Sequence, residues 1–246
     1  MRVKFFLKSF LLFFLCGGIA FAQKSDKKMD HGEDHQQIFH AFRVEADIGE
    51  MRDFSSKAFE LSGFVGGDYD RLWINSEKKN YGDYEEIFEA QALYSRNIDQ
   101  FWDAQIGVAH DFSIDFTKAN VNYFVVGLEG LAPQFFETKA QILLSEKGNY
   151  SARFKQEVDI FLTQRLITRP YFTTEISALD DLKLEVKSGI SNFEIGVATR
   201  YEITRKFAPY FALRYHTKTF GTADLAKQLV KKIDNFIVTI GVEFNL

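Results

Sequence analysis

The chain has 246 residues, of which 16% are aromatic and 26% are charged, and its formal net charge is −4. This length allows one domain with a sizeable core. After residue 22 no uncharged apolar run is long enough for a membrane-spanning helix, which argues against a helical membrane protein. The acidic balance disfavours nucleic acid as a partner and favours cations.

The first 22 residues have the pattern of a secretory signal peptide. A basic start and an apolar stretch precede Ala20-Phe21-Ala22, a small-residue cleavage site. A lipoprotein signal at Cys16 is the rival, but the bulky Leu15 stands where a small residue is expected. Cleavage after residue 22 leaves 27 Lys and Arg against 34 Asp and Glu, a net charge of −7. It also removes the one cysteine, so no disulfide or thiol chemistry is expected.

Residues 23–37 are polar and charged without apolar periodicity, which predicts a flexible periplasmic tail. The tail contains Met29, His31 and His35, the densest group of metal-binding residue types in the chain. Imidazole and thioether groups are copper ligands, Cu(II) favouring nitrogen and oxygen and Cu(I) favouring sulfur. The tail therefore predicts a weak copper-capture site, and the alternative is a solvated linker with incidental histidines.

Alternation of apolar and polar residues with period two runs through most of residues 38–246. Successive side chains of a strand point to opposite faces, so each segment has one apolar and one mostly polar face. The longer segments match the ~9–11 residues that a tilted strand needs to cross a bilayer. The segments are 38–48, 58–66, 71–76, 85–95, 101–112, 121–131, 136–144, 150–162, 170–177, 192–202, 207–216 and 235–246.

The connections between these segments decide the strand number. Treating Gly66–Asp70 as a turn gives twelve strands, and bacterial single-chain barrels have even numbers. Ten strands is the alternative if a segment near the N-terminus folds otherwise. Residues 76–83 and 179–188 are predicted loops, and 223–232 has helical spacing that predicts a short helix in an external loop. We therefore predict an all-β fold, an antiparallel transmembrane β-barrel of about 12 strands over residues 38–246.

The polar face of a membrane barrel lines its lumen, whereas in a soluble sandwich the apolar face forms the core. The signal peptide and the segment lengths favour the barrel. The charged lumen then has two interpretations, a salt-bridged plug or an acid-biased funnel that admits cations. Glu129, beside glycines, is the best candidate for a carboxylate near a constriction, and we expect it to pair with an arginine. The main lumen acids are Glu45, Asp47, Glu89, Asp103, Glu129 and Glu157, joined by Glu60, Asp111, Glu137, Asp159, Glu194 and Glu202, and the bases are Arg43, Lys139, Arg153, Lys155, Arg200 and Arg214.

Other polar residues have weaker functional signals. Asp68, Asp70 and Arg71 follow two glycines and predict a local turn network rather than a metal site. His110 and His216 fall near strand ends, where they would contact the lumen or a loop. No G-x-S-x-G nucleophile motif is present, so we do not predict an outer-membrane hydrolase.

Several short motifs lie in order across the chain after residue 58. They are GGDYDRLW at 66–73, LYSR at 93–96, FWD at 101–103, GLEGLAP at 127–133, LTQRL at 162–166, RYEI at 200–203, FAPY at 207–210 and GTADLA at 221–226. The ordered set resembles the copper resistance protein B family of Gram-negative outer membranes. The resemblance implies an outer-membrane barrel that binds or transports copper ions, alongside a periplasmic multicopper oxidase and copper carriers.

Two features depart from the family pattern. Some members have a long tail rich in methionine and histidine, whereas this tail is short, which weakens a copper-storage role. The sequence ends Phe244-Asn245-Leu246 and not on the aromatic residue usual in barrel-insertion signals, so Phe244 or Leu246 would serve in assembly. The leading hypothesis is a copper-handling barrel with an acidic lumen, and the alternative is a structural barrel with a closed, salt-bridged lumen and no transport role.

Overall fold

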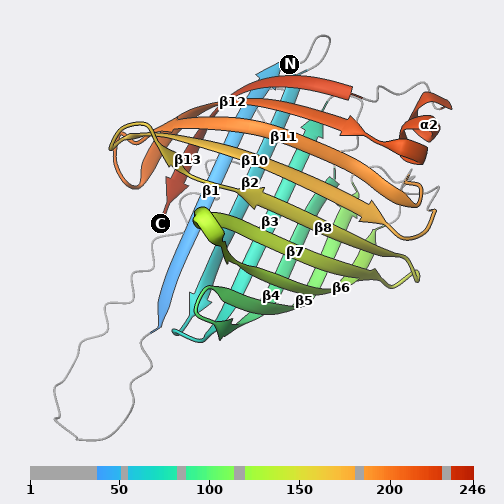
Figure 1. Ribbon diagram of the computed structural model, residues 1–246, viewed down its shortest axis with the longest axis horizontal. Coiled ribbons are helices and arrows are strands. Elements are labelled where there is room, and N and C mark those ends of the chain that lie inside the picture. Colours follow the sequence, from blue (N-terminus) through green and yellow to red (C-terminus); the bar gives the residue numbers. More distant parts are fainter. Residues whose placement is uncertain (1–37, 51–54, 82–86, 114–119, 181–185, 229–233) are drawn as a thin grey trace, which may run out of the picture. The chain divides into compact units, whose positions relative to one another are not determined.

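A computed structural model describes residues 38–50, 55–81, 87–113, 120–180, 186–228 and 234–246 (Figure 1). In these ranges the chain forms a closed antiparallel β-barrel of twelve strands. The pieces β8 and β9 count as one strand, because both pair with β10. The strands are β1 (Phe39–Glu50), β2 (Ser55–Gly66), β3 (Asp70–Tyr81), β4 (Ile87–Asp99), β5 (Trp102–Ser113), β6 (Val121–Ala132), β7 (Phe136–Ser145), β8 (Tyr150–Glu157), β9 (Ile160–Phe161), β10 (Leu166–Ser177), β11 (Gly189–Tyr201), β12 (Phe207–Lys218) and β13 (Asp234–Asn245).

The barrel closes where β1 pairs with β13, in a register that runs from Arg43 opposite Asn245 to Glu50 opposite Val238. Phe42 and Leu246 exchange backbone hydrogen bonds beside this seam, at 3.2 and 2.9 Å. When β8 and β9 are taken as one strand, every strand of the described part has a neighbour on both sides. Closure satisfies the backbone groups that lipid could not hydrogen-bond.

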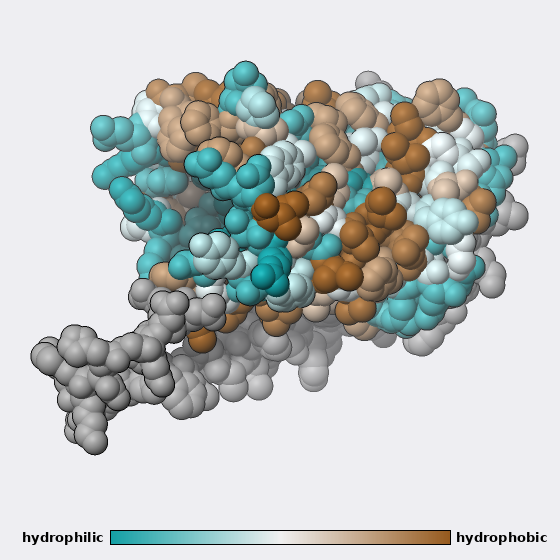
Figure 2. Space-filling view, turned by 60° about the horizontal axis from the view of Figure 1, so that its bottom comes forward, coloured by the Kyte–Doolittle hydropathy of each residue, from teal (hydrophilic) through white to brown (hydrophobic). Residues whose placement is uncertain are grey.

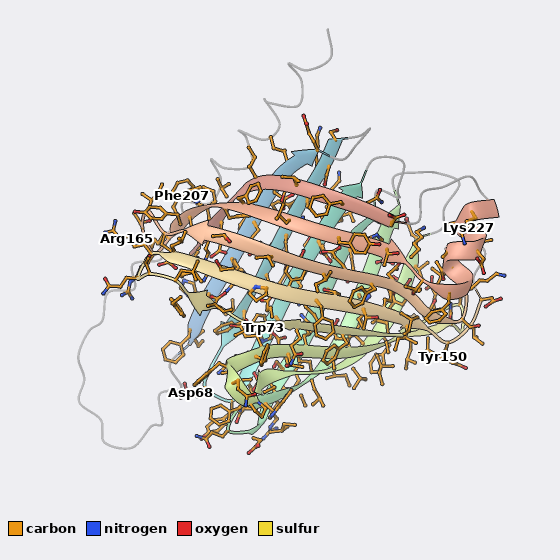
Figure 3. All side chains as sticks on the ribbon, turned by 45° about the horizontal axis from the view of Figure 1, so that its top comes forward. Asp68, Trp73, Tyr150, Arg165, Phe207 and Lys227 are labelled. Carbon is orange, nitrogen blue, oxygen red and sulfur yellow. The ribbon has the colours of Figure 1, made fainter. Side chains whose placement is uncertain are left out.

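The connections at the two ends differ in length. One end, which we name the turn end, has connections of two to five residues, including the 3-10 helix η1 (Pro133–Phe135) between β6 and β7. The other, the loop end, carries residues 178–188 and the connection with helix α2 (Phe220–Gln228). Figure 3 places Asp68, Arg165 and Phe207 at the turn end, and Tyr150 and Lys227 at the loop end.

The outer surface of the barrel is apolar. Large hydrophobic side chains on the outward face are widely exposed, for example Ile240 at 60% and Val126 at 43%. Figure 2 shows hydrophobic side chains over the body of the barrel and hydrophilic ones toward its ends. Such a band suits contact with lipid hydrocarbon. Among the described residues, no helix is long and apolar enough to cross a membrane.

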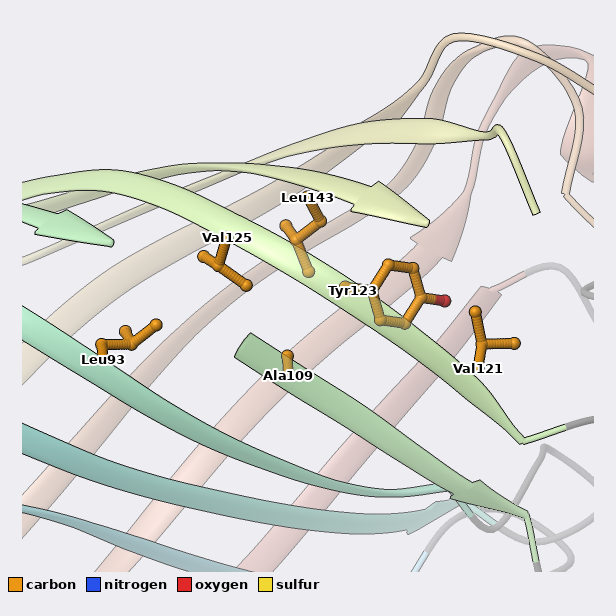
Figure 4. Close-up of a cluster of buried hydrophobic side chains, with 6 residues drawn as sticks. All are labelled: Leu93, Ala109, Val121, Tyr123, Val125 and Leu143. Atoms are coloured by element: carbon orange, nitrogen blue, oxygen red, sulfur yellow. The ribbon is translucent and has the colours of Figure 1, made fainter. Parts of the chain in front are cut away.

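Part of the inner wall is also apolar. The lumen-facing side chains of β4 to β7 form a buried cluster with Trp73 packed against it, and Leu93, Val125 and Leu143 have no exposed surface (Figure 4). These side chains fill that side of the interior, as expected for a narrow barrel. The cluster consists of Leu93, Ala109, Val121, Tyr123, Val125 and Leu143.

Several segment boundaries differ from the sequence prediction; for example, β2 begins at Ser55 and β11 at Gly189, three residues before the predicted starts at 58 and 192. Strand β3 continues to Tyr81 through residues predicted as a loop, because its backbone pairs with β2 whatever the polarity of its side chains. The predicted segment 150–162 is broken between β8 and β9. Strand β10 begins at Leu166 and includes Pro170, which lies opposite that break, where proline's missing N–H removes no regular ladder bond.

The helix in the connection between β12 and β13 begins at Phe220, three residues before the predicted start at 223. It extends to Gln228, and residues 229–233 lie outside the described part. The prediction of a short helix at this place in the chain is otherwise consistent with the fold. Figure 1 shows α2 at the end of the barrel opposite the C-terminus.

Candidate functional site

The main feature of the lumen is a row of carboxylates on six neighbouring strands, β13 and β1 to β5. Each acid lies directly opposite the next in the pairing register, and alternation directs all of them inward. We name this set the acid row. Its members, in order around the barrel, are Glu243, Glu45, Glu60, Glu77, Glu89 and Asp111.

The acid row runs from one end of the barrel to the other. Glu243 lies two residues from the turn end of β13, and Asp111 lies two residues from the loop end of β5. Strands in a barrel tilt by ~35–45° from its axis, so a line of cross-strand neighbours climbs along the wall. The row is therefore a continuous acidic track through the lumen.

Like charges on directly opposed residues destabilise a sheet. The acid row contains five such pairs in succession. A sequence selected for stability alone would avoid them. Breaks of a local rule of this kind are expected at functional sites.

Basic side chains from the opposite wall reach the acid row across the lumen. Arg153 of β8 forms an ion pair with Glu89 of β4. Arg169 Nη1 of β10 lies 3.4 Å from Glu45 Oε1 and 3.8 Å from Glu243 Oε2. Lys155 Nζ of β8 lies 4.0 Å from Glu60 Oε1 of β2. Because β8 and β10 are not neighbours of β1, β2, β4 or β13 in the sheet, these contacts span the interior.

The same three bases also contact acids on their own side of the barrel. Arg153 Nε lies 3.5 Å from Glu175 Oε1, Lys155 Nζ lies 3.0 Å from Glu157 Oε2, and Arg169 Nε lies 2.8 Å from Asp159 Oδ1. Each base therefore has at least one carboxylate partner on each wall. We name Arg153, Lys155 and Arg169 the bridging bases.

A second charged group lies beside the seam. Arg214 Nη2 of β12 donates to Asp47 Oδ2 of β1 at 2.5 Å, and Tyr210 Oη donates to the same oxygen at 2.8 Å. The Asp47 side chain is 2% exposed and that of Arg214 is 10% exposed. The ring of Tyr210 lies over Gly241, where an added Cβ would meet its Cζ at 2.5 Å. This group is a buried structural network.

A cavity of about 660 Å³ lies between the two walls and extends to the turn end. Acids of the row line one side of it, and the bridging bases line the other. Ala41, Asn245 and Leu246 line it at the turn end. The interior is thus polar and partly hollow, with ion pairs crossing the hollow part.

The predicted lumen acids do not gather in one cluster. Glu45 and Glu89 belong to the acid row, Asp47 to the seam network, and Glu157 to the Lys155 contact on the opposite wall. Asp103 accepts from Arg71 Nη1 at 3.3 Å and from Asn97 Nδ2 at 3.0 Å, near the turn end.

Glu129 also lies near the turn end, on β6. It accepts from Gln105 Nε2 at 2.7 Å and lies 3.7 Å from Lys139 Nζ. Its cationic partner is therefore a lysine of the neighbouring strand β7, whereas an arginine was expected. The register places Lys139 directly opposite Glu129, which fixes this choice.

The residues of the predicted turn network lie around the connection between β2 and β3. Arg71 donates to the backbone carbonyls of Gly67 at 3.4 Å and Asp68 at 3.2 Å. Asp70 accepts from the Tyr94 hydroxyl and lies 3.9 Å from Arg96 Nε. The predicted metal ligands Met29, His31 and His35 lie outside the described residues. Within the described ranges, no three His, Cys, Asp or Glu side chains are arranged to hold a metal ion.

Four residues of the lumen system are absent from the sequence prediction: Glu77, Arg169, Glu175 and Glu243. Glu77 falls in the predicted loop 76–83, although Trp73, Asn75 and Glu77 continue the period-two pattern of β3. Glu243 lies on the mostly small or polar face of the last predicted segment, but the predicted lumen acids do not include it. Arg169 lies before the predicted start of its strand, and alternation with Tyr171 would have placed it inside.

A closed barrel with an apolar exterior and a charged interior defines the class of outer-membrane β-barrel proteins. The family described as Copper resistance protein B precursor (CopB) matches residues 39–245, and the chain belongs to this family. Copper resistance protein B of Escherichia coli is 31% identical over 184 residues, covering 75% of this chain and 61% of that protein.

A second relative, the Copper resistance protein B homolog of Pseudomonas syringae pv. tomato, is 32% identical over 179 residues, covering 73% of this chain and 60% of that protein. The matched region spans about three-fifths of the length of these relatives.

Solved structures with a similar fold are outer-membrane barrels. The NanC porin aligns with a TM-score of 0.58 at 14% identity, covering 82% of this chain and all of that one. The KdgM porin aligns with a TM-score of 0.52 at 10% identity, covering 82% of this chain and 98% of that one. Outer membrane phospholipase A from Escherichia coli aligns with a TM-score of 0.50 at 13% identity, covering 82% of this chain and 89% of that one. These likenesses show the fold, and together with the family they place the protein in the outer membrane.

Proposed function

We propose that this protein binds copper ions in its lumen and passes them across the outer membrane along the acid row. The observation that carries the proposal is the unbroken series of six carboxylates from the turn end to the loop end. Family membership supplies the metal, since copper resistance is the role for which both relatives are named.

The chemistry of the row suits a mobile cation. Cu(II) accepts oxygen ligands, and directly opposed residues in an antiparallel sheet have Cα atoms about 4.5–5.5 Å apart. Two neighbouring carboxylates can therefore contact one ion, which can then move to the next pair. Several weak sites in series allow an ion both to enter and to leave a channel.

An imidazole near the loop end adds a nitrogen donor to the lumen. His216 of β12 is opposite Glu194 of β11 and Asn235 of β13 in the register, all on the lumen face. His40 and His110, the other histidines in the described ranges, lie on the outward face. His216 is therefore a nitrogen ligand for Cu(II) near one mouth of the barrel.

The orientation follows from the connections. Barrels of this class have short turns in the periplasm and longer loops outside, which assigns the turn end to the periplasm. Strand β1 starts at that end, so residues 23–37 would lie in the periplasm after removal of the signal peptide 1–22. There Met29, His31 and His35 would capture copper and exchange it with a periplasmic multicopper oxidase or copper carriers.

Copper flux into proteoliposomes tests the conduit. Vesicles containing the full-length mature protein should take up copper, and Glu60→Gln with Glu77→Gln should reduce the initial rate at least severalfold. Asp224→Asn, an exposed acid of α2 paired with Lys227, is the matched control and should leave the rate unchanged. Calorimetric copper titration with and without residues 23–37 separates tail binding from lumen binding.

The bridging bases favour a second candidate, a structural barrel whose lumen is closed by ion pairs. Under that candidate, vesicles with the protein show no copper flux above protein-free vesicles, and the acid-row variants lower only stability. Absence of both copper binding and copper flux would remove the conduit and leave this candidate.

A further inference from the structure

We infer that Arg153, Lys155 and Arg169 determine which cations enter the acid row, acting as built-in counter-ions that exclude monovalent ions and are displaced by divalent ions. This inference rests on the proposed function, because it assumes that the acid row is a cation path. It assigns a specificity role to three residues on the wall that carries no part of the row.

The positions of the bridging bases support this role. They contact Glu89, Glu60 and Glu45, which lie on three of the six strands of the row. An ion moving along the row meets an arginine or lysine side chain at each of these levels. Arg200 of β11 also reaches the row, with its Nε 3.9 Å from Glu243 Oε1. Lys139 does not reach it, since it contacts Glu129 on the adjacent strand.

The physical basis is a competition for the row carboxylates. A guanidinium or ammonium group donates charge-assisted hydrogen bonds to a carboxylate, and the strand holds it in place. A potassium ion offers a single charge and no hydrogen bond. A divalent ion has twice the Coulomb attraction and can contact two opposed carboxylates at once, for example Glu60 and Glu77. It can therefore displace a bridging base where a monovalent ion cannot.

The acids of the opposite wall make displacement reversible. A base released from the row keeps its second partner, Glu175, Glu157 or Asp159. No buried charge is then left without a counter-charge, which would otherwise oppose displacement strongly. The pair of acids around each base thus gives it two positions, one closing the row and one leaving it open.

Ion currents through the full-length mature protein in planar bilayers test the inference. In symmetric KCl the wild type should conduct weakly, and with KCl on one side and CaCl₂ on the other its reversal potential should show preference for calcium. Arg153→Gln with Lys155→Gln should raise the potassium conductance at least threefold and abolish the calcium preference. Lys139→Gln is the matched control, because it removes a lumen base that does not cross the interior, and it should behave as wild type.

Three results would overturn the inference: a wild type that prefers potassium to calcium, a double variant with wild-type potassium conductance, or a Lys139→Gln variant that opens equally. If the double variant does not fold, Lys155→Gln alone serves, because this side chain is 37% exposed and its removal disturbs packing least. Failure of the proposed function is distinguishable, since calcium preference in the wild type without copper flux into vesicles would refute copper passage and leave the selectivity intact.

Discussion

The seam network gives the sharpest stability prediction. Asp47→Ala removes the carboxylate that Arg214 and Tyr210 share, and leaves a guanidinium whose side chain is only 10% exposed. Breaking a buried pair by removing one partner costs about 3–5 kcal/mol. Tyr210→Phe removes only one hydrogen bond to the same carboxylate, so we expect it to cost about 1 kcal/mol.

Removing both charges of the pair should recover most of the stability that Asp47→Ala loses. Asp47→Leu with Arg214→Leu removes both members of the ion pair, and replacement of a buried pair by apolar groups is often neutral. We therefore expect the double variant to be more stable than Asp47→Ala. The assay is equilibrium unfolding by urea in lipid vesicles, followed by fluorescence of the two tryptophans of the chain.

Asp224→Ala provides the control, because its ion pair with Lys227 has side chains 68% and 63% exposed. It should not change the unfolding midpoint, since exposed pairs contribute little. If Asp47→Ala lowered the free energy of unfolding no more than Tyr210→Phe does, the assignment of Asp47 as the counter-charge of Arg214 would be refuted.

Three further substitutions test packing at different places in the barrel. Gly241→Ala should cost about 1–3 kcal/mol in the same unfolding assay, because the added methyl meets Tyr210, whereas Gly67→Ala enters open space and should be neutral. Ile240→Arg, at the middle of the lipid face, should cost about 2–4 kcal/mol by the same measurement, and no loss would contradict the lipid assignment. Leu143→Ala should cost about 2–5 kcal/mol through the cavity it leaves, while Leu162→Ala, 59% exposed in a turn, should cost little.

The face of each strand was predictable because alternation is a local property. Residues such as Glu45 and Glu89 were assigned to the lumen from the polarity of their neighbours alone, and the structure places both there. The same reasoning failed for Glu77, because the polar residues around it resemble a loop. Backbone pairing with β2 and β4, which the side chains do not encode locally, makes that segment a strand.

The acid row itself was not predictable from local patterns. It depends on the register of five strand pairs, and a shift of two residues in any one of them would interrupt it. Contacts across the lumen are more remote still, since Arg169 and Glu45 are 124 residues apart and meet only when the barrel closes. The diameter and stagger of the whole sheet set which side chains face one another, and neither can be read from a single segment.

The series of like charges on β1 to β5 has a consequence for biogenesis. While only β1 to β5 have been delivered, their facing carboxylates repel, so an early hairpin in this part gains little from adopting its final alignment. The alignment becomes favourable when β8 and β10 arrive with their bases. The amino-terminal strands are thus kept from closing prematurely into a smaller sheet. The complete barrel forms only when the later strands supply the opposite charge.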